Sequence, residues 1–161
     1  MGSGKTTVAQ ALAHALDCAL LDLDRLITER LERTPKEIIE EDGEAAFREV
    51  ETRFLQEVLA AGSAQVIALG GGAWTVEATR ELITSHNGFT VWLDAPFEVC
   101  WQRIEAAGSE RPLARDKESA LHLYQLRRGA YELTELWIEA TAERSVSEMA
   151  AEIKDAIETR S

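Results

Sequence analysis

The chain has 161 residues, 45% of them hydrophobic and 29% charged, and a formal net charge of −12 at pH 7. This length suits one domain with a core of its own, and no apolar run approaches the ~20 residues of a membrane span. The acidic balance argues against nucleic acid and against an anionic membrane as partners. An acidic protein that binds an anionic substrate must gather its arginines at one place, so arginines in unusual contexts merit attention.

Helical and extended patterns alternate along the chain. Helices are expected over residues 5–17, 24–33, 35–41, 44–60, 76–84, 96–106, 118–133 and 145–159. Short apolar runs typical of buried strands cover residues 19–21, 65–69, 89–93 and 136–140. Strands that alternate with helices indicate a parallel α/β sheet with right-handed crossovers. We expect a single domain over residues 1–161, with a polar loop at about residues 108–117.

A phosphate-binding loop is predicted at the start of the chain, in the stretch Gly2-Ser3-Gly4-Lys5-Thr6-Thr7. The two glycines allow backbone N–H groups to approach phosphate oxygens. Lys5 would reach the β- and γ-phosphates, and the Thr6 hydroxyl would bind Mg²⁺. Met-Gly-Ser-Gly also occurs as a remnant of cloning. The 3.6-residue apolar period that follows, from Val8 to Leu16, favours the loop.

The motif G-x-x-x-x-G-K-[ST] also needs a glycine four residues before Gly4 and a strand before that. Residue 1 comes too late in the motif to supply either. We therefore expect a central strand upstream of residue 1. A polypeptide of residues 1–161 without it is expected to be severely destabilised, because native stabilities are only about 5–15 kcal/mol.

Two acidic residues close the first predicted strand. Asp22 and Asp24 are alternate residues, so on an extended segment both carboxylates would face the same side. One would hold Mg²⁺, directly or through water, and the other would accept a proton from an attacking hydroxyl. The alternative is that Asp24 only caps the next helix.

Arg48 and Glu51 lie three residues apart on one helix face. Such a pair is either a surface ion pair of small value, or a carboxylate-binding guanidinium that Glu51 orients. The run Gly70-Gly71-Gly72 ends a predicted strand and contains more glycines than a tight turn needs. We interpret it as a close approach of backbone N–H groups to a ligand.

Further arginines come later in the chain. Arg111 lies in the polar loop, where a lid would bring its charge onto a transferring phosphoryl group. Arg127 and Arg128 lie near the end of a helix, and either could simply stabilise the helix dipole.

Taken together, these motifs resemble the shikimate kinase family along nearly the whole chain. The shared features are Gly-Ser-Gly-Lys-Thr-Thr, Asp22-x-Asp24, Phe47-Arg48-x-x-Glu51, Gly70-Gly71-Gly72, Arg111-Pro112-Leu113 and Arg127-x-x-x-Tyr131. The resemblance implies a P-loop NTPase-type three-layer sandwich and ATP-dependent phosphorylation of the 3-hydroxyl of shikimate, in aromatic amino-acid biosynthesis. We expect a monomeric enzyme.

The resemblance also implies roles for individual residues. Gly2 to Thr7 would bind ATP, Thr6 would bind Mg²⁺, and Asp22 would support the metal through water. Asp24 would contact the reacting hydroxyl and Arg111 would reach the phosphates. The shikimate carboxylate would be held by Arg48 and Arg127, with a backbone contact from Gly71.

The chain departs from the family pattern at some positions. Gly129 stands where the family usually has proline, so Arg127 is expected to be held less rigidly. Glu139-Ala140 replaces the usual Asp-Thr, which leaves the adenine-side loop unassigned. Two alternatives stay open: another small-molecule P-loop kinase, such as a gluconate or nucleoside monophosphate kinase, and a shikimate-kinase-like protein that binds nucleotide with little catalysis.

The cysteines indicate the compartment. Cys18 and Cys100 show no metal-ligand spacing and lie in apolar stretches, as expected of free thiols in a reducing environment. The sequence shows no secretory leader. We therefore expect a cytoplasmic protein.

Overall fold

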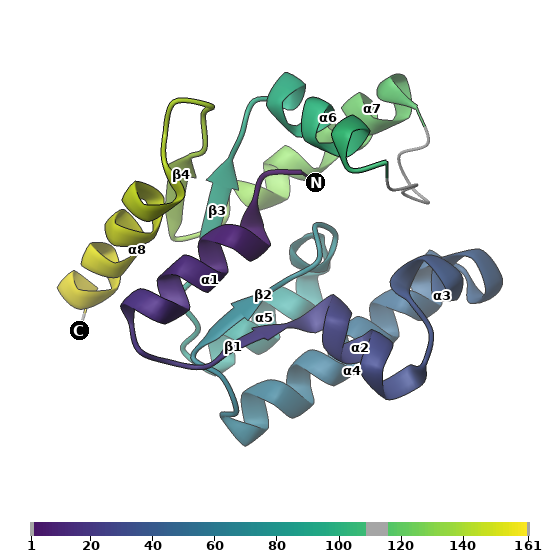
Figure 1. The fold of residues 1–161 in the computed structure, drawn as a ribbon. Coiled ribbons are helices and arrows are strands. Elements are labelled where there is room, and N and C mark those ends of the chain that lie inside the picture. The colour runs from purple at the N-terminus through teal and green to yellow at the C-terminus, as the bar shows by residue number, and fades with distance from the viewer. Residues whose placement is uncertain (1, 109–115, 161) are drawn as a thin grey trace. The chain divides into compact units, whose positions relative to one another are not determined.

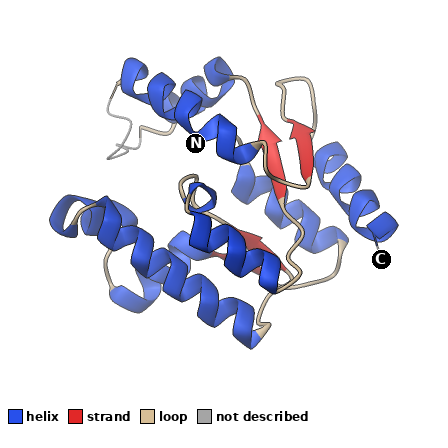
Figure 2. Cartoon of the chain, turned by 180° about the vertical axis from the view of Figure 1, so that it is seen from behind, coloured by secondary structure: helices blue, strands red, loops and turns tan. Residues whose placement is uncertain are grey.

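The computed structural model describes residues 2–108 and 116–160, and the chain divides into two compact units. The first unit combines residues 1–18 with residues 89–161, and the second unit comprises residues 19–88. The described residues form four strands, which make two separate two-stranded parallel sheets, one in each unit (Figure 2).

The first unit contains one sheet and four helices among its described residues. Their bounds are α1 Lys5–Ala15, β3 Val91–Asp94, α6 Phe97–Ala106, α7 Lys117–Tyr131, β4 Leu136–Glu139 and α8 Val146–Arg160. Strands β3 and β4 pair in register from Val91 opposite Leu136 to Asp94 opposite Glu139. Helix α8 packs along α1 and against β4 (Figure 1). The buried side chains include Leu12 of α1, Ile138 of β4 and Ile153 of α8.

The second unit is built around a long helix. Its elements are β1 Leu20–Asp22, α2 Leu23–Leu31, α3 Pro35–Asp42, α4 Glu44–Ala61, β2 Val66–Ala68, the short 3₁₀ helix η1 Ala73–Thr75, and α5 Glu77–Ser85. Strands β1 and β2 pair from Leu20 opposite Val66 to Asp22 opposite Ala68. Helix α4 packs against α2, α3 and α5, and the core includes Ile27, Phe54 and Leu55.

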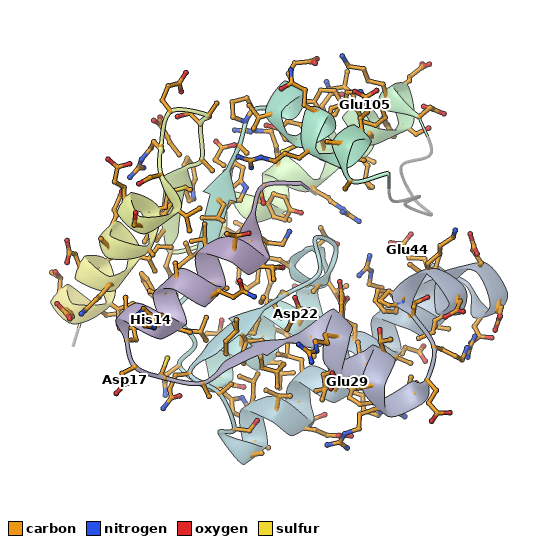
Figure 3. The ribbon with its side chains drawn as sticks, viewed as in Figure 1. His14, Asp17, Asp22, Glu29, Glu44 and Glu105 are labelled. Atoms are coloured by element: carbon orange, nitrogen blue, oxygen red, sulfur yellow. The ribbon has the colours of Figure 1, made fainter. Side chains whose placement is uncertain are left out.

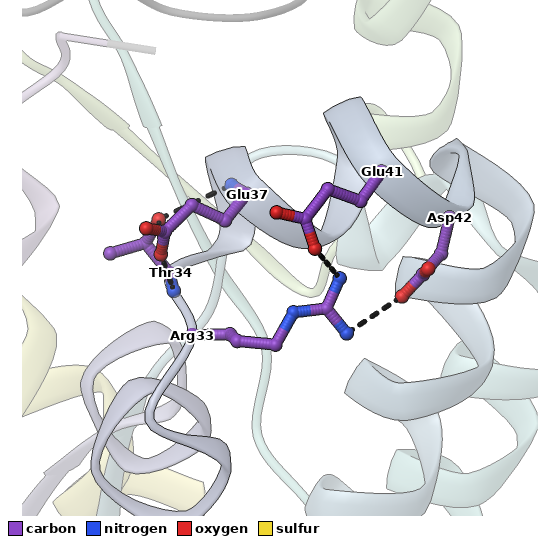
Figure 4. A network of polar contacts seen from close by, with 5 residues as sticks. All are labelled: Arg33, Thr34, Glu37, Glu41 and Asp42. Atoms are coloured by element: carbon purple, nitrogen blue, oxygen red, sulfur yellow. Dashed lines mark hydrogen bonds and ion pairs between the residues drawn. The ribbon is translucent and has the colours of Figure 1, made fainter.

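A polar network sets the start of α3 (Figure 4). The Thr34 hydroxyl accepts a hydrogen bond from the Glu37 backbone N–H at 3.2 Å, and the Glu37 carboxylate accepts one from the Thr34 backbone N–H at 2.7 Å. This is a reciprocal capping box, and Pro35 occupies the first helical position. Arg33 bridges Glu41 at 2.7 Å and Asp42 at 2.8 Å. The helix start that Thr34-Pro35 predicts is therefore confirmed.

The α/β class with parallel strands is confirmed, and each expected helix and strand is present. Most element bounds lie one or two residues from those expected, which is the usual uncertainty at frayed ends. The 3₁₀ helix η1 was not expected from the pattern. The strand predicted upstream of residue 1 and the single-domain organisation stay predictions.

In the two described stretches, 2–108 and 116–160, no helix combines the length and the apolar character needed to cross a membrane.

Candidate functional site

The predicted phosphate loop runs directly into α1. Gly2 has φ +64° and Gly4 has φ +90°, values that favour glycine. Gly4 is the residue before the helix, and no described side chain caps α1. The first N–H groups of an α-helix have no acceptor within the helix, and they carry the positive end of its dipole. The loop therefore has the backbone geometry of an anion cradle.

Helix α6 supports this loop from one side. A Cβ at Gly2 would lie 2.5 Å from the Cys100 carbonyl oxygen, so only glycine fits. Arg103 Nη1 donates a hydrogen bond to the Gly2 carbonyl oxygen at 3.1 Å, and it lies 3.5 Å from the position of a Cβ at Gly4. Arg103 is thus a cation beside the cradle that sequence reasoning missed, because the contact joins residues 101 positions apart.

The loop also fits a phosphate-bound magnesium ion. Among the described residues no group of three or more His, Cys, Asp or Glu side chains could hold a metal ion. Mg²⁺ commonly takes one or two protein oxygens and completes its shell with phosphate oxygens and water. Thr6, in the first turn of α1, supplies a hydroxyl of the kind such a site needs.

The geometry expected for Asp22 and Asp24 is wrong. Strand β1 ends at Asp22 and α2 begins at Leu23, so Asp24 lies in the first helical turn rather than on an extended segment. The alternative, that Asp24 caps the helix, is also wrong, because the Asp22 carboxylate accepts the hydrogen bond from the Arg25 N–H at 3.2 Å. Figure 3 labels Asp22 where β1 meets α2. A strong N-cap residue starts the helix earlier than the apolar pattern indicates.

Arg48 and Glu51 form a largely buried ion pair on α4. Arg48 Nη1 contacts Glu51 Oε2 at 2.6 Å, and the two side chains are 14% and 2% exposed. Arg48 Nη2 contacts Glu44 Oε1 at 3.1 Å, and Figure 3 labels Glu44 at the start of α4. Burial lowers the pKa of Arg48, but the ion pairs with Glu51 and Glu44 outweigh it and raise the pKa above its ordinary value. The surface-pair interpretation is therefore wrong, and Glu51 orients a guanidinium that stays charged.

The glycine run brings these side chains together. A Cβ at Gly72 would lie only 2.0 Å from Arg48 Nη2, and a Cβ at Gly70 would lie 2.7 Å from Glu51 Oε1 and 3.0 Å from Asp24 Oδ1. Gly72 has φ −97°, so space and not backbone strain requires glycine there. The interpretation that the glycine run makes space for a ligand is therefore wrong at positions 70 and 72. Protein side chains occupy the space where Cβ atoms would lie at these two positions. Gly71 lies between them in the turn before η1.

The structure separates the two neighbouring arginines of α7. Arg127 is 7% exposed. Arg128 forms a two-point ion pair with Asp94 at the end of β3, with distances of 2.7 and 3.0 Å. The alternative that Arg128 serves only the helix dipole is therefore wrong. Sequence reasoning missed Asp94, although an acidic residue at the carboxyl end of a predicted strand is a signal that could have found it.

The predicted site residues fall into both units. Lys5, Thr6 and Arg127 belong to the first unit, and Asp24, Arg48 and Gly71 belong to the second. Arg111 lies outside the described residues. The expectation that the two sets face each other stays a prediction.

Comparisons with known proteins agree with the motifs. The family model for shikimate kinase matches residues 1–158. A shikimate kinase from Cereibacter sphaeroides is 38% identical over 163 aligned positions, which cover 99% of this chain and 80% of that protein. One from Ruegeria pomeroyi is also 38% identical and covers 99% of this chain and 82% of that protein. The crystallised shikimate kinase from Acinetobacter baumannii in complex with shikimate has a TM-score of 0.89, 34% identity, and coverage of 99% of this chain and 89% of that one.

Proposed function

The chain belongs to the shikimate kinase family, and we propose that it transfers the γ-phosphoryl group of ATP to the 3-hydroxyl group of shikimate. The observation that carries this proposal is the cluster of Asp24, Arg48 and Glu51 around Gly70 and Gly72. It combines one oriented guanidinium with one nearby carboxylate. A hydroxylated acid needs these two groups: one to bind its carboxylate and one to accept the proton of its hydroxyl.

The phosphate loop binds the nucleotide. Backbone N–H groups of residues 2–7 at the start of α1 contact phosphate oxygens, and Lys5 balances their charge. The bound Mg²⁺ would neutralise charge that develops on the phosphates, with the Thr6 hydroxyl as its protein ligand and Asp22 as a more distant partner through water. Asp22 can serve this second role while it caps α2, since a carboxylate accepts several hydrogen bonds.

Arg48 binds the carboxylate of the acceptor. Its guanidinium is held on one side by the buried carboxylate of Glu51, so little rotamer entropy is lost when a substrate binds. On the other side, Nη2 contacts Glu44, which is 49% exposed. An exposed pair of this kind contributes little, so an incoming carboxylate displaces Glu44 from Nη2. Arg127 supplies a second guanidinium for the same carboxylate. Gly71 supplies a backbone contact to the acceptor.

Asp24 serves as the proton acceptor in the chemical step. As the 3-hydroxyl oxygen forms its bond to the γ-phosphorus, the bond from that phosphorus to the β–γ bridging oxygen breaks and ADP leaves. The hydroxyl proton passes to the Asp24 carboxylate. Arg111 of the lid loop contributes positive charge at the phosphoryl group, as predicted from the sequence.

A coupled assay of ADP release tests this function. We expect turnover with shikimate and none with gluconate or nucleoside monophosphates. Turnover of gluconate or a nucleotide without turnover of shikimate would reverse the assignment. Nucleotide binding by calorimetry without phosphoryl transfer to any small alcohol would instead indicate a binding protein.

Two arginine variants of α4 test the carboxylate site. Arg48→Ala should raise the KM for shikimate by about a hundredfold, which corresponds to the loss of a charged hydrogen-bonding group worth about 1.5–3 kcal/mol. Arg53→Ala is the matched control, since Arg53 is an exposed arginine on the same helix, above the Phe54 ring. It should leave KM unchanged. An unchanged KM in Arg48→Ala would remove the assignment of Arg48.

We also propose that the protein works as a monomer in the cytoplasm. Its cysteines, Cys18 and Cys100, are free, which suits a reducing compartment. Size-exclusion chromatography with light scattering checks the monomeric state.

A further inference from the structure

A two-point ion pair fastens α7 to the end of β3. Arg128 Nη1 lies 2.7 Å from Asp94 Oδ1, and Nη2 lies 3.0 Å from Asp94 Oδ2. Nη1 also donates to the Tyr124 hydroxyl oxygen at 2.8 Å, and the Tyr124 hydroxyl donates to the Ala95 carbonyl oxygen at 3.0 Å. Two residues one turn apart on α7 thus bind consecutive residues at the end of β3.

Aromatic contacts extend this attachment to the last turn of α7. The Arg128 guanidinium lies 4.8 Å from the centre of the Trp92 ring on β3. The Tyr131 ring packs on the same Trp92, with 5.6 Å between ring centres. We call Asp94, Tyr124 and Arg128, together with Trp92 and Tyr131, the α7 clamp.

The clamp holds the helix on both sides of Arg127. Tyr124 lies three residues before Arg127, and Tyr131 lies four residues after it. Adjacent helical residues are about 100° apart around the axis, so the side chain of Arg127 leaves the helix on a different face from that of Arg128. Fixing Tyr124, Arg128 and Tyr131 therefore fixes the position from which the Arg127 side chain departs.

Gly129 makes such fixation necessary. It lies in the last turn of α7, and glycine has more conformational freedom than any other residue. Apart from its chain neighbours and the backbone of its own helix, no atom of the described residues lies within 4 Å of the place where a Cβ at Gly129 would be. Close packing therefore does not require a glycine at position 129. It also does not stiffen the backbone beside Arg127. The α7 clamp supplies contacts at Arg128, directly before Gly129, and at Tyr131, two residues after it.

The clamp also commits Arg128 to contacts within the protein. Arg128 has both terminal nitrogens on Asp94, and its hydrogen bond to that carboxylate raises the pKa of Arg128 above its ordinary value. Its charge is balanced within the protein. An incoming carboxylate would have to break a bidentate pair to reach it.

We propose that Asp94 and Arg128 are positioning residues that hold Arg127 in place for the substrate carboxylate. This inference rests on the proposed function, in which Arg127 binds that carboxylate. Because Arg127 acts in substrate binding, loss of the clamp should affect shikimate and leave ATP unaffected.

Two conservative variants test the clamp by steady-state kinetics. Asp94→Asn keeps the shape but removes the charge, and Arg128→Lys keeps the charge but removes the planar fork. Each should raise the KM for shikimate by about tenfold, less than the ~100-fold expected for a misplacement of 1 Å. The kcat value and the KM for ATP should change less than about twofold. A KM for shikimate within twofold of the wild type in both variants would overturn the proposal.

The matched control breaks a different ion pair of the same unit. Arg160 pairs with Glu135 at 2.8 Å, and Glu135 lies just before β4. Arg160→Gln should leave both KM values unchanged. An increase in the KM for shikimate equal to that of Asp94→Asn would show that general loosening of the unit is responsible, and would overturn the positioning role.

The Arg127→Ala background separates positioning from any other effect. If the clamp acts through Arg127, adding Asp94→Asn to Arg127→Ala should not lower kcat/KM for shikimate any further. A further decrease of the same size as in the wild-type background would contradict the proposal.

Amide hydrogen exchange keeps this test independent of the proposed function. In Asp94→Asn, exchange should accelerate in residues 125–131 and stay unchanged in α8. Should the wild-type protein fail to phosphorylate shikimate, the proposed function falls. Accelerated exchange would then still support the clamp, and unchanged exchange would refute it.

Discussion

Adding one methyl group at Gly72 should disable the carboxylate site without touching any charged residue. A Cβ there would lie 2.0, 2.4 and 2.8 Å from Nη2, Cζ and Nη1 of Arg48, whereas ordinary contacts begin at 3.4 Å. The guanidinium must therefore move by more than about 1 Å, since carbon atoms meet nitrogen or carbon at about 3.5 Å. The backbone itself tolerates alanine, because φ is −97°.

The cost of Gly72→Ala follows from what restrains Arg48. Its partner Glu51 is buried and lies 2.6 Å away, so a shift of the guanidinium stretches a buried ion pair. A misplacement of 1 Å costs about a hundredfold in catalysis, and overpacking costs about 1–3 kcal/mol of stability. We expect the KM for shikimate to rise about a hundredfold and the thermal midpoint to fall by about 2–10 °C. The KM for ATP should stay within about twofold.

The coupled ADP-release assay and a thermal unfolding scan measure both effects. Gly129→Ala is the matched control, because a Cβ there meets open space in the last turn of α7. It should stabilise the protein by about 0.4–1 kcal/mol and leave KM unchanged. The double variant Gly72→Ala with Arg48→Ala should bind shikimate no worse than Arg48→Ala alone. A Gly72→Ala protein with wild-type KM and wild-type midpoint would refute the reasoning.

The remaining predictions concern the proton acceptor and the acid side of stability. Asp24→Asn should lower kcat/KM by about a hundredfold, as for loss of a positioned base, with nucleotide affinity unchanged in calorimetry; a wild-type rate would exclude Asp24 as the base. Hydrogen bonds from the Thr34 backbone and hydroxyl lower the pKa of Glu37 below its ordinary 4.5. The stability that this carboxylate contributes is therefore present above pH 4.5 and lost as the pH falls through its lowered pKa. Thr34→Ala removes an N-cap worth about 1 kcal/mol. Its thermal midpoint should be lower at neutral pH and fall less steeply below pH 4.5 than that of the wild type; parallel curves would contradict the capping role.

Local signals in the sequence predicted much of the fold. Thr34-Pro35 predicts the start of α3, because both the N-cap and the proline act within one helical turn. The glycines before Lys5 predict a loop of positive φ, which Gly2 and Gly4 adopt. At Asp22 the local pattern gave a wrong prediction. The Asp22 carboxylate caps α2, so the helix begins before Asp24, and Asp24 does not lie on an extended segment.

The sequence alone determined the alternation of apolar runs and helical periods. It also determined which residues carry the chemistry. Only the tertiary structure decided which distant groups meet: Arg103 with Gly2 across 101 positions, Arg128 with Asp94 across 34, and the glycine run with Arg48 and Glu51. Propensity and capping act within a few residues, so they can state that Arg48 and Glu51 share a helix face. Whether that face is buried, and which backbone lies against it, depends on how α4 packs with α2, α5 and η1, and no local pattern contains that information.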